Sequence, residues 1–320
     1  MTRRYPESGL PDAIDASIRY LNSAAALRSI EADPYWPKWN SPWWHMTLLW
    51  ELDLAERIPE RAAHRMAISL ATQYTKRFPG FDDTISTTGY RYQKVPWCHC
   101  SLGTILQVLS ACGQDIDRIL PWTRSWLLQH QLPDGGLNCE EAAYLKPSAK
   151  SSIVSTLPPL EAILALSKGK PTAAEAAFLD KGAHYLLAHR LFRAAGAEGR
   201  IINPDWTRPS FPRFYDYDIL RGLVILVRWA HINNRTLPLD AIKESLNILE
   251  TSFADGNIRV LRLAWHGVDT LMPEPGGDLR RGGQASTFDL LLHAGRVGEI
   301  SRELTRSWKF VKRALDAIAH

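Results

Sequence analysis

The first candidate site comprises four residues with metal-binding side chains: the run Cys98-His99-Cys100 and, further on, Cys139. Thiolate and imidazole groups are the usual ligands of zinc, and four of them complete a tetrahedral site. The spacing of the first pair is unfavourable. At the start of a helix, Cys98 and Cys100 would point about 200° apart, because each residue turns the helix by about 100°. We therefore expect no bound cofactor, with zinc at these four residues as the alternative.

The same segment allows two other interpretations. At a helix N-terminus the helix dipole would lower the pKa of Cys98, which could then act as a nucleophile beside His99. Alternatively, Cys98 and Cys100 pack as small hydrophobic residues. In either case His99 is a candidate for proton transfer, because imidazole titrates near neutral pH.

A second candidate site is the segment from Arg213 to Arg221, which enters a long apolar stretch. We predict Asp218 and Tyr217 as proton-transfer groups, with Tyr215 and Arg213 as substrate-binding groups. The alternative is structural, because Asp218 could pair with Arg213 or Arg221 and favour the start of a helix. An aspartate beside an arginine would stay ionised rather than act as an acid.

Aromatic and cationic residues precede the first apolar helix, in a chain that contains 12 tryptophans. Lys38 lies between Trp36 and Trp39, so these three residues and Trp43 are predicted to bind substrate, through an anion or through cation–π contacts. His45 is the only titratable side chain nearby and is a candidate general base. Alternatively, the tryptophans cover the helix ends and His45 is structural.

Four further residues on later loops are predicted to bind substrate: Trp97, Cys98, Glu140 and Ser151. Ser151 could instead cap the helix that follows it. Glu140 and its neighbour Glu141 are adjacent in the chain, which does not ensure the carboxylate separation of about 5–9 Å that a glycosidase needs.

The hydrophobic pattern predicts amphipathic helices alternating with apolar ones, five times over and with a closing amphipathic helix. The amphipathic helices are expected at 11–23, 59–78, 122–131, 172–191, 238–253 and 300–319. The apolar helices are expected at 43–54, 97–112, 150–167, 211–232 and 284–294. A strand hairpin is expected near 257–265. Such antiparallel helix pairs close into a ring or open into a solenoid, and the buried helices favour the ring.

This order gathers the N-termini of the apolar helices, and the long loops before them, at one end of the ring. Long loops on a rigid scaffold commonly carry binding sites. Several helix N-termini around one cavity would also present positive, donor-rich ends to an anion.

Trp126-Leu127, Gln131 and Asp134-Gly135-Gly136 resemble the repeat motif of the squalene/terpene cyclase and protein prenyltransferase superfamily, with Leu137 in place of the second aromatic residue. The resemblance implies an all-α fold, an α/α toroid. Its two concentric rings would contain about five to six helical hairpins around a central cavity. We expect residues 1–320 to form a single α/α-toroid domain.

The resemblance also bears on the candidate sites. Class II terpene cyclases protonate their substrates with an Asp-rich motif, to which Asp216-Tyr217-Asp218 is partly similar. The protein prenyltransferases bind zinc through toroid loops, but Lys150-Ser151-Ser152 stands where their Asp-x-Cys pair would lie. Two other segments, 33–39 and 41–46, are similar to a bacterial family, which implies no activity.

Length and composition limit the remaining possibilities. The 320 residues are 45% hydrophobic and 22% charged, which suits one large or two ordinary globular domains. The net charge is +4, and Lys and Arg are spread along the helices, so we expect a solvated surface and no nucleic-acid partner. No apolar run reaches about 18 residues and no secretory signal begins the chain, so we expect no membrane span. Four cysteines do not form a disulfide framework, which favours the cytoplasm.

The sequence therefore predicts a non-redox enzyme that acts on a small molecule in a central cavity. The expected reaction is an acid–base cyclisation, elimination or displacement, with an anionic leaving group stabilised by helix termini and Lys38. Three alternatives remain open: a carbohydrate-active toroid (hydrolase or lyase), a prenyl-chain enzyme and a non-catalytic binding module.

Overall fold

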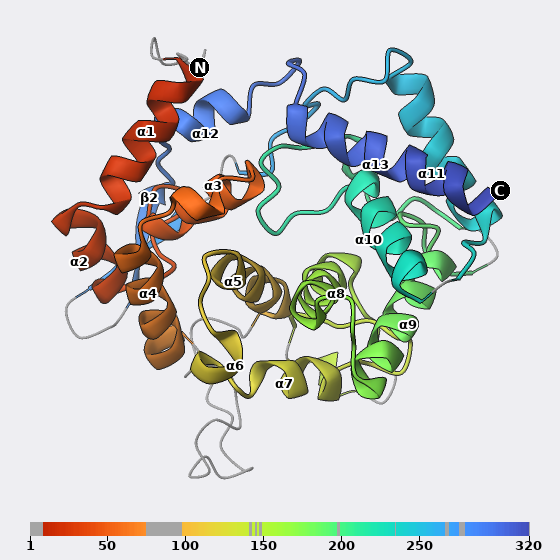
Figure 1. Ribbon diagram of the computed structural model, residues 1–320, viewed down its shortest axis with the longest axis horizontal. Coiled ribbons are helices and arrows are strands. Elements are labelled where there is room, and N and C mark those ends of the chain that lie inside the picture. Colours follow the sequence, from red (N-terminus) through yellow and green to blue (C-terminus); the bar gives the residue numbers. More distant parts are fainter. Residues whose placement is uncertain are drawn as a thin grey trace. The chain divides into compact units, whose positions relative to one another are not determined.

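The computed structural model describes residues 9–74, 98–140, 143–144, 146, 149–196, 199–233, 235–265, 269–274 and 279–319. Within these ranges the chain is mostly helical and contains one pair of antiparallel strands (Figure 1). The prediction of a mostly helical protein is confirmed. None of the described helices has both the length and the hydropathy needed to cross a membrane.

The chain divides into two compact units. Unit 1 consists of Met1–Trp97, Val108–Pro121 and Trp265–Gly295. Unit 2 consists of Cys98–Gln107, Trp122–Ala264 and Arg296–His320. Helix α5 (His99–Ala111) contributes residues to both.

Unit 1 is built from helices that bury aromatic and aliphatic side chains against one another. Its remaining helices are α1 (Leu10–Leu21), α2 (Ala24–Ala32), α3 (Pro42–Glu51), α4 (Glu60–Ser69), α6 (Ile116–Ile119) and α12 (Asp289–Ala294). Short helical turns follow at Ala55–Arg57 and Leu70–Tyr74. Helix α1 packs on α2, α3 and α12, and α2 packs on α4. Helix α3 is buried almost all round, as its apolar sequence predicts.

The strands of unit 1 lie later in the chain than expected. Strands β1 (Asp269–Pro273) and β2 (Leu279–Gln284) pair antiparallel, with Leu271 opposite Arg281. The expected hairpin near 257–265 is therefore wrong. That stretch makes only isolated bridges among the described residues, Arg259 to Ile300 and Ser210 to Arg262.

Unit 2 alternates a buried helix with partly exposed ones. Its remaining helices are α7 (Thr123–Gln129), α8 (Ile153–Ser167), α9 (Ala173–Ala188), α10 (Ile219–Ile232), α11 (Leu239–Ser252) and α13 (Arg302–Ala319), with a 3₁₀ turn at Pro204–Thr207. Helix α8 packs on α9 and α10 (Figure 1), and α10 also packs on α11 and α13.

Close backbone approach fixes the position of α8 within unit 2. A Cβ atom at Gly103 of α5 would lie 2.4 Å from the backbone of Pro158, and one at Gly182 of α9 would lie 2.3 Å from Leu160 Cδ2. Gln107 donates to the Pro158 carbonyl at 3.3 Å. Gly103 of α5 therefore permits close packing on α8.

Helix α10 begins at Ile219, not near residue 211 as expected. Asp218 caps it through a 2.9 Å hydrogen bond from the Arg221 N–H, which stops the helix from extending toward the N-terminus. Residues 211–218 form a loop instead, with Phe214 at a positive φ of 55°.

Candidate metal centre

Three cysteine sulfurs converge in unit 2. The Sγ atom of Cys98 lies 2.8 Å from that of Cys100 and 3.3 Å from that of Cys139. Cys98 immediately precedes α5, Cys100 lies in the first turn of α5, and Cys139 lies on the loop after α7. The expectation that Cys98 and Cys100 diverge is wrong, because α5 begins at His99 and helical spacing does not constrain Cys98.

The cluster fits the chemistry of a thiolate-bound metal ion. All three thiols are free, and their ligand atoms lie within 4.8 Å of one another. Zn–S bonds of about 2.3 Å in a tetrahedral site separate the sulfurs by about 3.8 Å. To bind one metal ion, the sulfur of Cys98 would therefore have to move away from the sulfurs of Cys100 and Cys139 by about 1 Å or less. The three sulfurs could hold a metal ion, and the Cys-x-Cys spacing does not prevent it.

His99 does not belong to this ligand set. Its Nδ1 lies 2.7 Å from the Asn138 carbonyl oxygen, and its Nε2 accepts a hydrogen bond from Trp126 Nε1 at 3.2 Å. Because the Trp126 N–H can only donate, Nδ1 carries the proton and donates to Asn138. Burial lowers the pKa of His99 to about 4, so the ring is neutral at pH 7. The four-residue zinc site, which was the alternative to the expectation of no cofactor, is therefore reduced to its three cysteines.

Hydrogen bonds to Asn138 and Cys139 position the loop that carries the Cys139 thiol. Tyr144 donates a second hydrogen bond to the Asn138 carbonyl at 3.1 Å, and its hydroxyl accepts the Asn138 N–H at 3.0 Å. The Cys139 N–H donates to Ser155 Oγ on α8 at 3.1 Å. These bonds hold the backbone on both sides of the Cys139 thiol.

The cysteine with the most acidic thiol is Cys139, not Cys98. Hydrogen bonds from Cys100 and Cys98 hold the pKa of Cys139 well below its usual value. The hydrogen bond with Cys100 lowers the pKa of Cys98, but the bond to Cys139, burial and the Cys139 charge together raise it to about 12. The alternative interpretation, in which the helix N-terminus lowers the pKa of Cys98, is therefore wrong.

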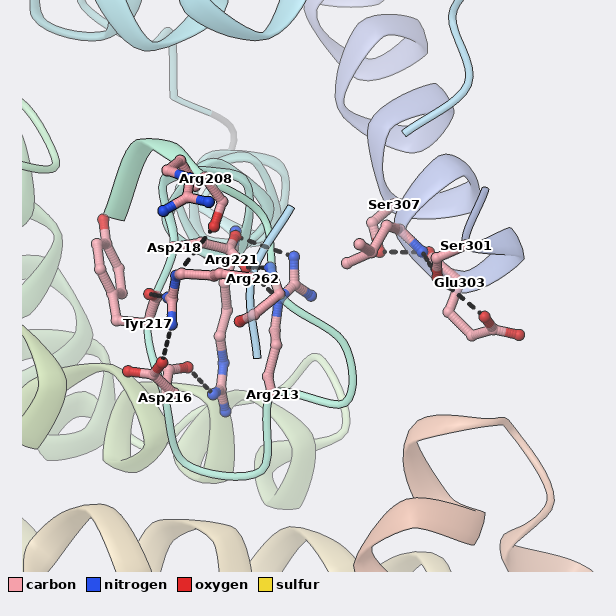
Figure 2. A network of polar contacts seen from close by, with 12 residues as sticks. Arg208, Arg213, Asp216, Tyr217, Asp218, Arg221, Arg262, Ser301, Glu303 and Ser307 are labelled. Atoms are coloured by element: carbon pink, nitrogen blue, oxygen red, sulfur yellow. Dashed lines mark hydrogen bonds and ion pairs between the residues drawn. The ribbon is translucent and has the colours of Figure 1, made fainter. Parts of the chain in front are cut away.

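The second candidate segment forms an ion-pair network (Figure 2). Arg213 donates to the Asp218 carboxylate from Nε at 2.7 Å and from Nη2 at 3.0 Å. Asp218 is fully buried. Burial alone would raise its pKa, but the charge and hydrogen bonds of Arg213 lower it below the usual value. Arg221 pairs with Glu161 of α8, and Arg262 pairs with Asp216. This geometry favours the structural interpretation of Asp218 and Arg213.

The two tyrosines of this segment differ in their surroundings. Tyr217 is buried and donates to the Leu191 carbonyl at 2.7 Å, and burial raises its pKa well above the usual value. Burial, followed by the charges of Cys100 and Cys98, raises the pKa of Tyr215. The hydroxyl of Tyr217 is therefore engaged by a backbone carbonyl, and substrate binding by Tyr215 stays a prediction.

The aromatic residues of unit 1 surround Lys38. Its Nζ lies 4.8 Å from the ring centroid of Trp39, 5.5 Å from that of Trp36 and 5.8 Å from that of Trp44. Trp43 is buried in α3. The predicted cation–π arrangement is thus formed by the protein's own lysine.

His45 is buried in unit 1 and stacks on Phe288, with ring centroids 3.6 Å apart. Its Nε2 lies 3.3 Å from Asn40 Oδ1, and Nδ1 has no hydrogen-bond partner among the described residues. Burial lowers the pKa of His45 to about 3. This position favours the structural interpretation of His45.

The remaining predicted residues lie on loops of unit 2 or outside the described ranges. Glu140 is exposed, and its N–H donates to Asn138 Oδ1 at 2.9 Å. Ser151 bonds to the Asp134 carboxylate through its N–H at 2.9 Å and through its hydroxyl. Trp97 lies outside the described residues.

Sequence reasoning missed the residues that support Cys139. Asn138, Tyr144 and Ser155 are ordinary polar residues, and their role arises from contacts across as many as 45 positions in the chain. A Tyr five residues after a Cys gives no signal by itself.

Comparisons of the chain with protein-family models, with curated proteins and with solved structures find no match. The candidate site is therefore assigned from the geometry of this chain.

Proposed function

We propose that this protein is an α/α-toroid enzyme that performs non-redox chemistry on a small molecule at a zinc–thiolate centre of Cys98, Cys100 and Cys139. The observation that carries the proposal is the convergence of three free thiols within 4.8 Å. Three protein ligands and one exchangeable position distinguish catalytic zinc sites from structural ones, which have four protein ligands. Cys98 and Cys139 are partly exposed, which supports access to that position.

The toroid part of the proposal rests on the superfamily motif and on the helix pattern of unit 2. Helix α8 is buried on almost all sides, whereas α9, which packs on it, and α11, which packs on α9, are partly exposed. An inner ring of buried helices and an outer ring of amphipathic ones has this alternation.

Each residue of the cluster has a defined task in the proposed site. Cys98, Cys100 and Cys139 would hold the ion, which when bound supplies a Lewis acid for a substrate oxygen or an acidified water. Asn138 and Ser155 orient Cys139. The N-terminus of α5, beside which the thiols lie, favours negative charge on a leaving group. We propose cyclisation, elimination or displacement as the reaction class.

Cobalt substitution tests whether the centre is catalytic. Co²⁺ bound by thiolates absorbs intensely, and its spectrum reports the coordination number. We expect the Co²⁺ protein to show thiolate bands that shift when cyanide or an alkyl thiol is added, because an exchangeable position accepts them. A spectrum that no added ligand changes would indicate four protein ligands and would reject a catalytic role. The Cys112→Ser variant, whose cysteine lies outside the cluster, serves as the control.

A further inference from the structure

Helix α13 borders a concave, open groove with a volume of about 720 Å³ in unit 2. The groove is lined by Asn257, Ile300, Arg302, Thr305, Arg306, Lys309, Lys312, Arg313 and Asp316. Five of these lining residues are cationic and one is acidic. This difference equals the formal charge of +4 for the whole chain, so the charged residues outside the groove sum to a formal charge of zero.

The cations lie on one face of a firmly packed helix. Four cations form a row about 16 Å long, because they follow one another along the helix at intervals of four, three and four residues. They are Arg302, Arg306, Lys309 and Arg313. On the opposite face, Leu304, Trp308 and Val311 are buried, and α13 packs on α10. In the chain these cations are separated by other residues, so they form a row only when the helix folds.

Four of the five lining cations contrast with other arginines of unit 2. Arg193, Arg213 and Arg221 each pair with a carboxylate. By contrast, Arg302, Lys309, Lys312 and Arg313 form no ion pair with a carboxylate in the described ranges. Like charges at helical spacing repel one another, so an anion that binds all of them relieves this repulsion.

From this groove we infer a binding site for a small oligophosphate, an anion with two or more linked phosphate groups. Guanidinium groups match phosphate oxygens with paired hydrogen bonds, and lysine adds a compact charge. The volume lies in the range of about 300–1,000 Å³ that small-molecule sites occupy. Thr305 Oγ1 accepts the Ile258 N–H at 3.0 Å, which leaves its hydroxyl proton to donate into the groove.

Two other polyanions fit the groove less well. A helix that binds a membrane surface inserts an exposed apolar face, and the apolar face of α13 is buried. Single-stranded nucleic acids bind by stacking their bases on aromatic rings, and no lining residue is aromatic. The site is separate from the cysteine centre, because none of the three cysteines lines it.

Calorimetric titration of the full-length protein with tripolyphosphate tests this inference. We expect saturable binding that weakens as salt rises, because the contacts are between charges. The double variant Arg306→Gln/Lys309→Gln should weaken binding by about tenfold or more, because it removes two charge-assisted contacts. The matched control is Lys181→Gln/Lys243→Gln, which removes the same charge from exposed positions on α9 and α11. This control should retain binding within about twofold.

Three outcomes would overturn the inference. The first is no binding of tripolyphosphate, and the second is equal weakening in both double variants. The third is tighter binding of anionic phospholipid vesicles or of an oligothymidylate than of tripolyphosphate, which would assign the groove to a membrane or to nucleic acid. Weaker binding of inorganic phosphate than of tripolyphosphate would support it, since one phosphate reaches fewer cations. The result is independent of metal at the cysteine centre and can be measured in the Cys139→Ser variant.

Discussion

Individual side chains decide which of the predicted residues could do chemistry. The three thiols approach one another at an accessible site, whereas Asp218, Tyr217 and His45 are buried and engaged in packing or hydrogen bonds. Sequence identified the residue types correctly, because Cys, His and Asp are the types that titrate or bind metals. Their partners could not be read from the sequence, since Cys139 reaches Cys98 across 41 positions.

The buried imidazole of His45 makes stability depend on pH. Its pKa is about 3 in the folded protein and about 6.5 when exposed. Below pH 6.5 the unfolded chain takes up a proton that the folded protein does not, so stability falls with pH until about pH 3. The loss is about 1.4 kcal/mol per pH unit. Between pH 7.5 and 5, we expect the wild type to lose about 2 kcal/mol more than His45→Gln in urea unfolding. Equal losses in the two proteins would show that His45 titrates normally.

The buried pair of Asp218 and Arg213 should be costly to break. Asp218→Asn leaves Arg213 without its charged partner, and we expect a loss of about 3–5 kcal/mol in the free energy of unfolding. The matched control is Asp205→Asn, whose pair with Arg208 is exposed, and a loss below about 1 kcal/mol is expected.

The difference in unfolding free energy between the wild type and Asp218→Asn should disappear as pH falls. A carboxylate with a lowered pKa contributes stability above its unfolded pKa, and that contribution is lost as pH falls through the folded pKa. Similar losses in the two variants at pH 7 would contradict the network described here.

At the scale of helices, the sequence predicted most elements and placed their ends less well. Hydrophobic periodicity located α8, α9, α11 and α13 to within a few residues, because their buried faces follow the helical repeat. The start of α10 was missed because Asp218 is held by Arg213, a tertiary contact that periodicity does not contain. The two strands were misplaced because only one of their residues, Thr270, is buried, so they show no alternation of buried side chains.

Packing of α5 on α8 supports the cysteine centre, since α5 carries Cys100 and α8 carries Ser155. Gly103→Ala would bring a Cβ atom to 2.4 Å from the Pro158 backbone. We expect a loss of about 1–3 kcal/mol in the free energy of unfolding, because one helix must move. Gly283→Ala provides the control, since nothing lies within 4 Å of a Cβ atom there. Denaturant unfolding of both variants measures the difference, and an unaffected Gly103 variant would show that the helices are less closely packed.

At the scale of the whole molecule, a mostly helical chain carries one cluster of thiols in the part that the structure describes. The alternation of apolar and amphipathic helices predicted the mostly helical fold, whereas zinc at the cysteines was only the alternative to the expectation of no bound cofactor. The sequence could not show that three sulfurs meet without His99, because that depends on α5 beginning at His99 and on the hydrogen bonds of the Cys139 loop.

Measurement of zinc bound to the purified, fully reduced protein after dialysis tests the proposed thiolate centre. We expect one zinc per chain in the wild type and in Cys112→Ser, with a thermal midpoint that falls when a chelator removes the metal. We expect little or no zinc in Cys139→Ser, which retains two of the three ligands. A wild type without stoichiometric zinc, or a Cys139→Ser variant that retains it, would contradict the proposed centre.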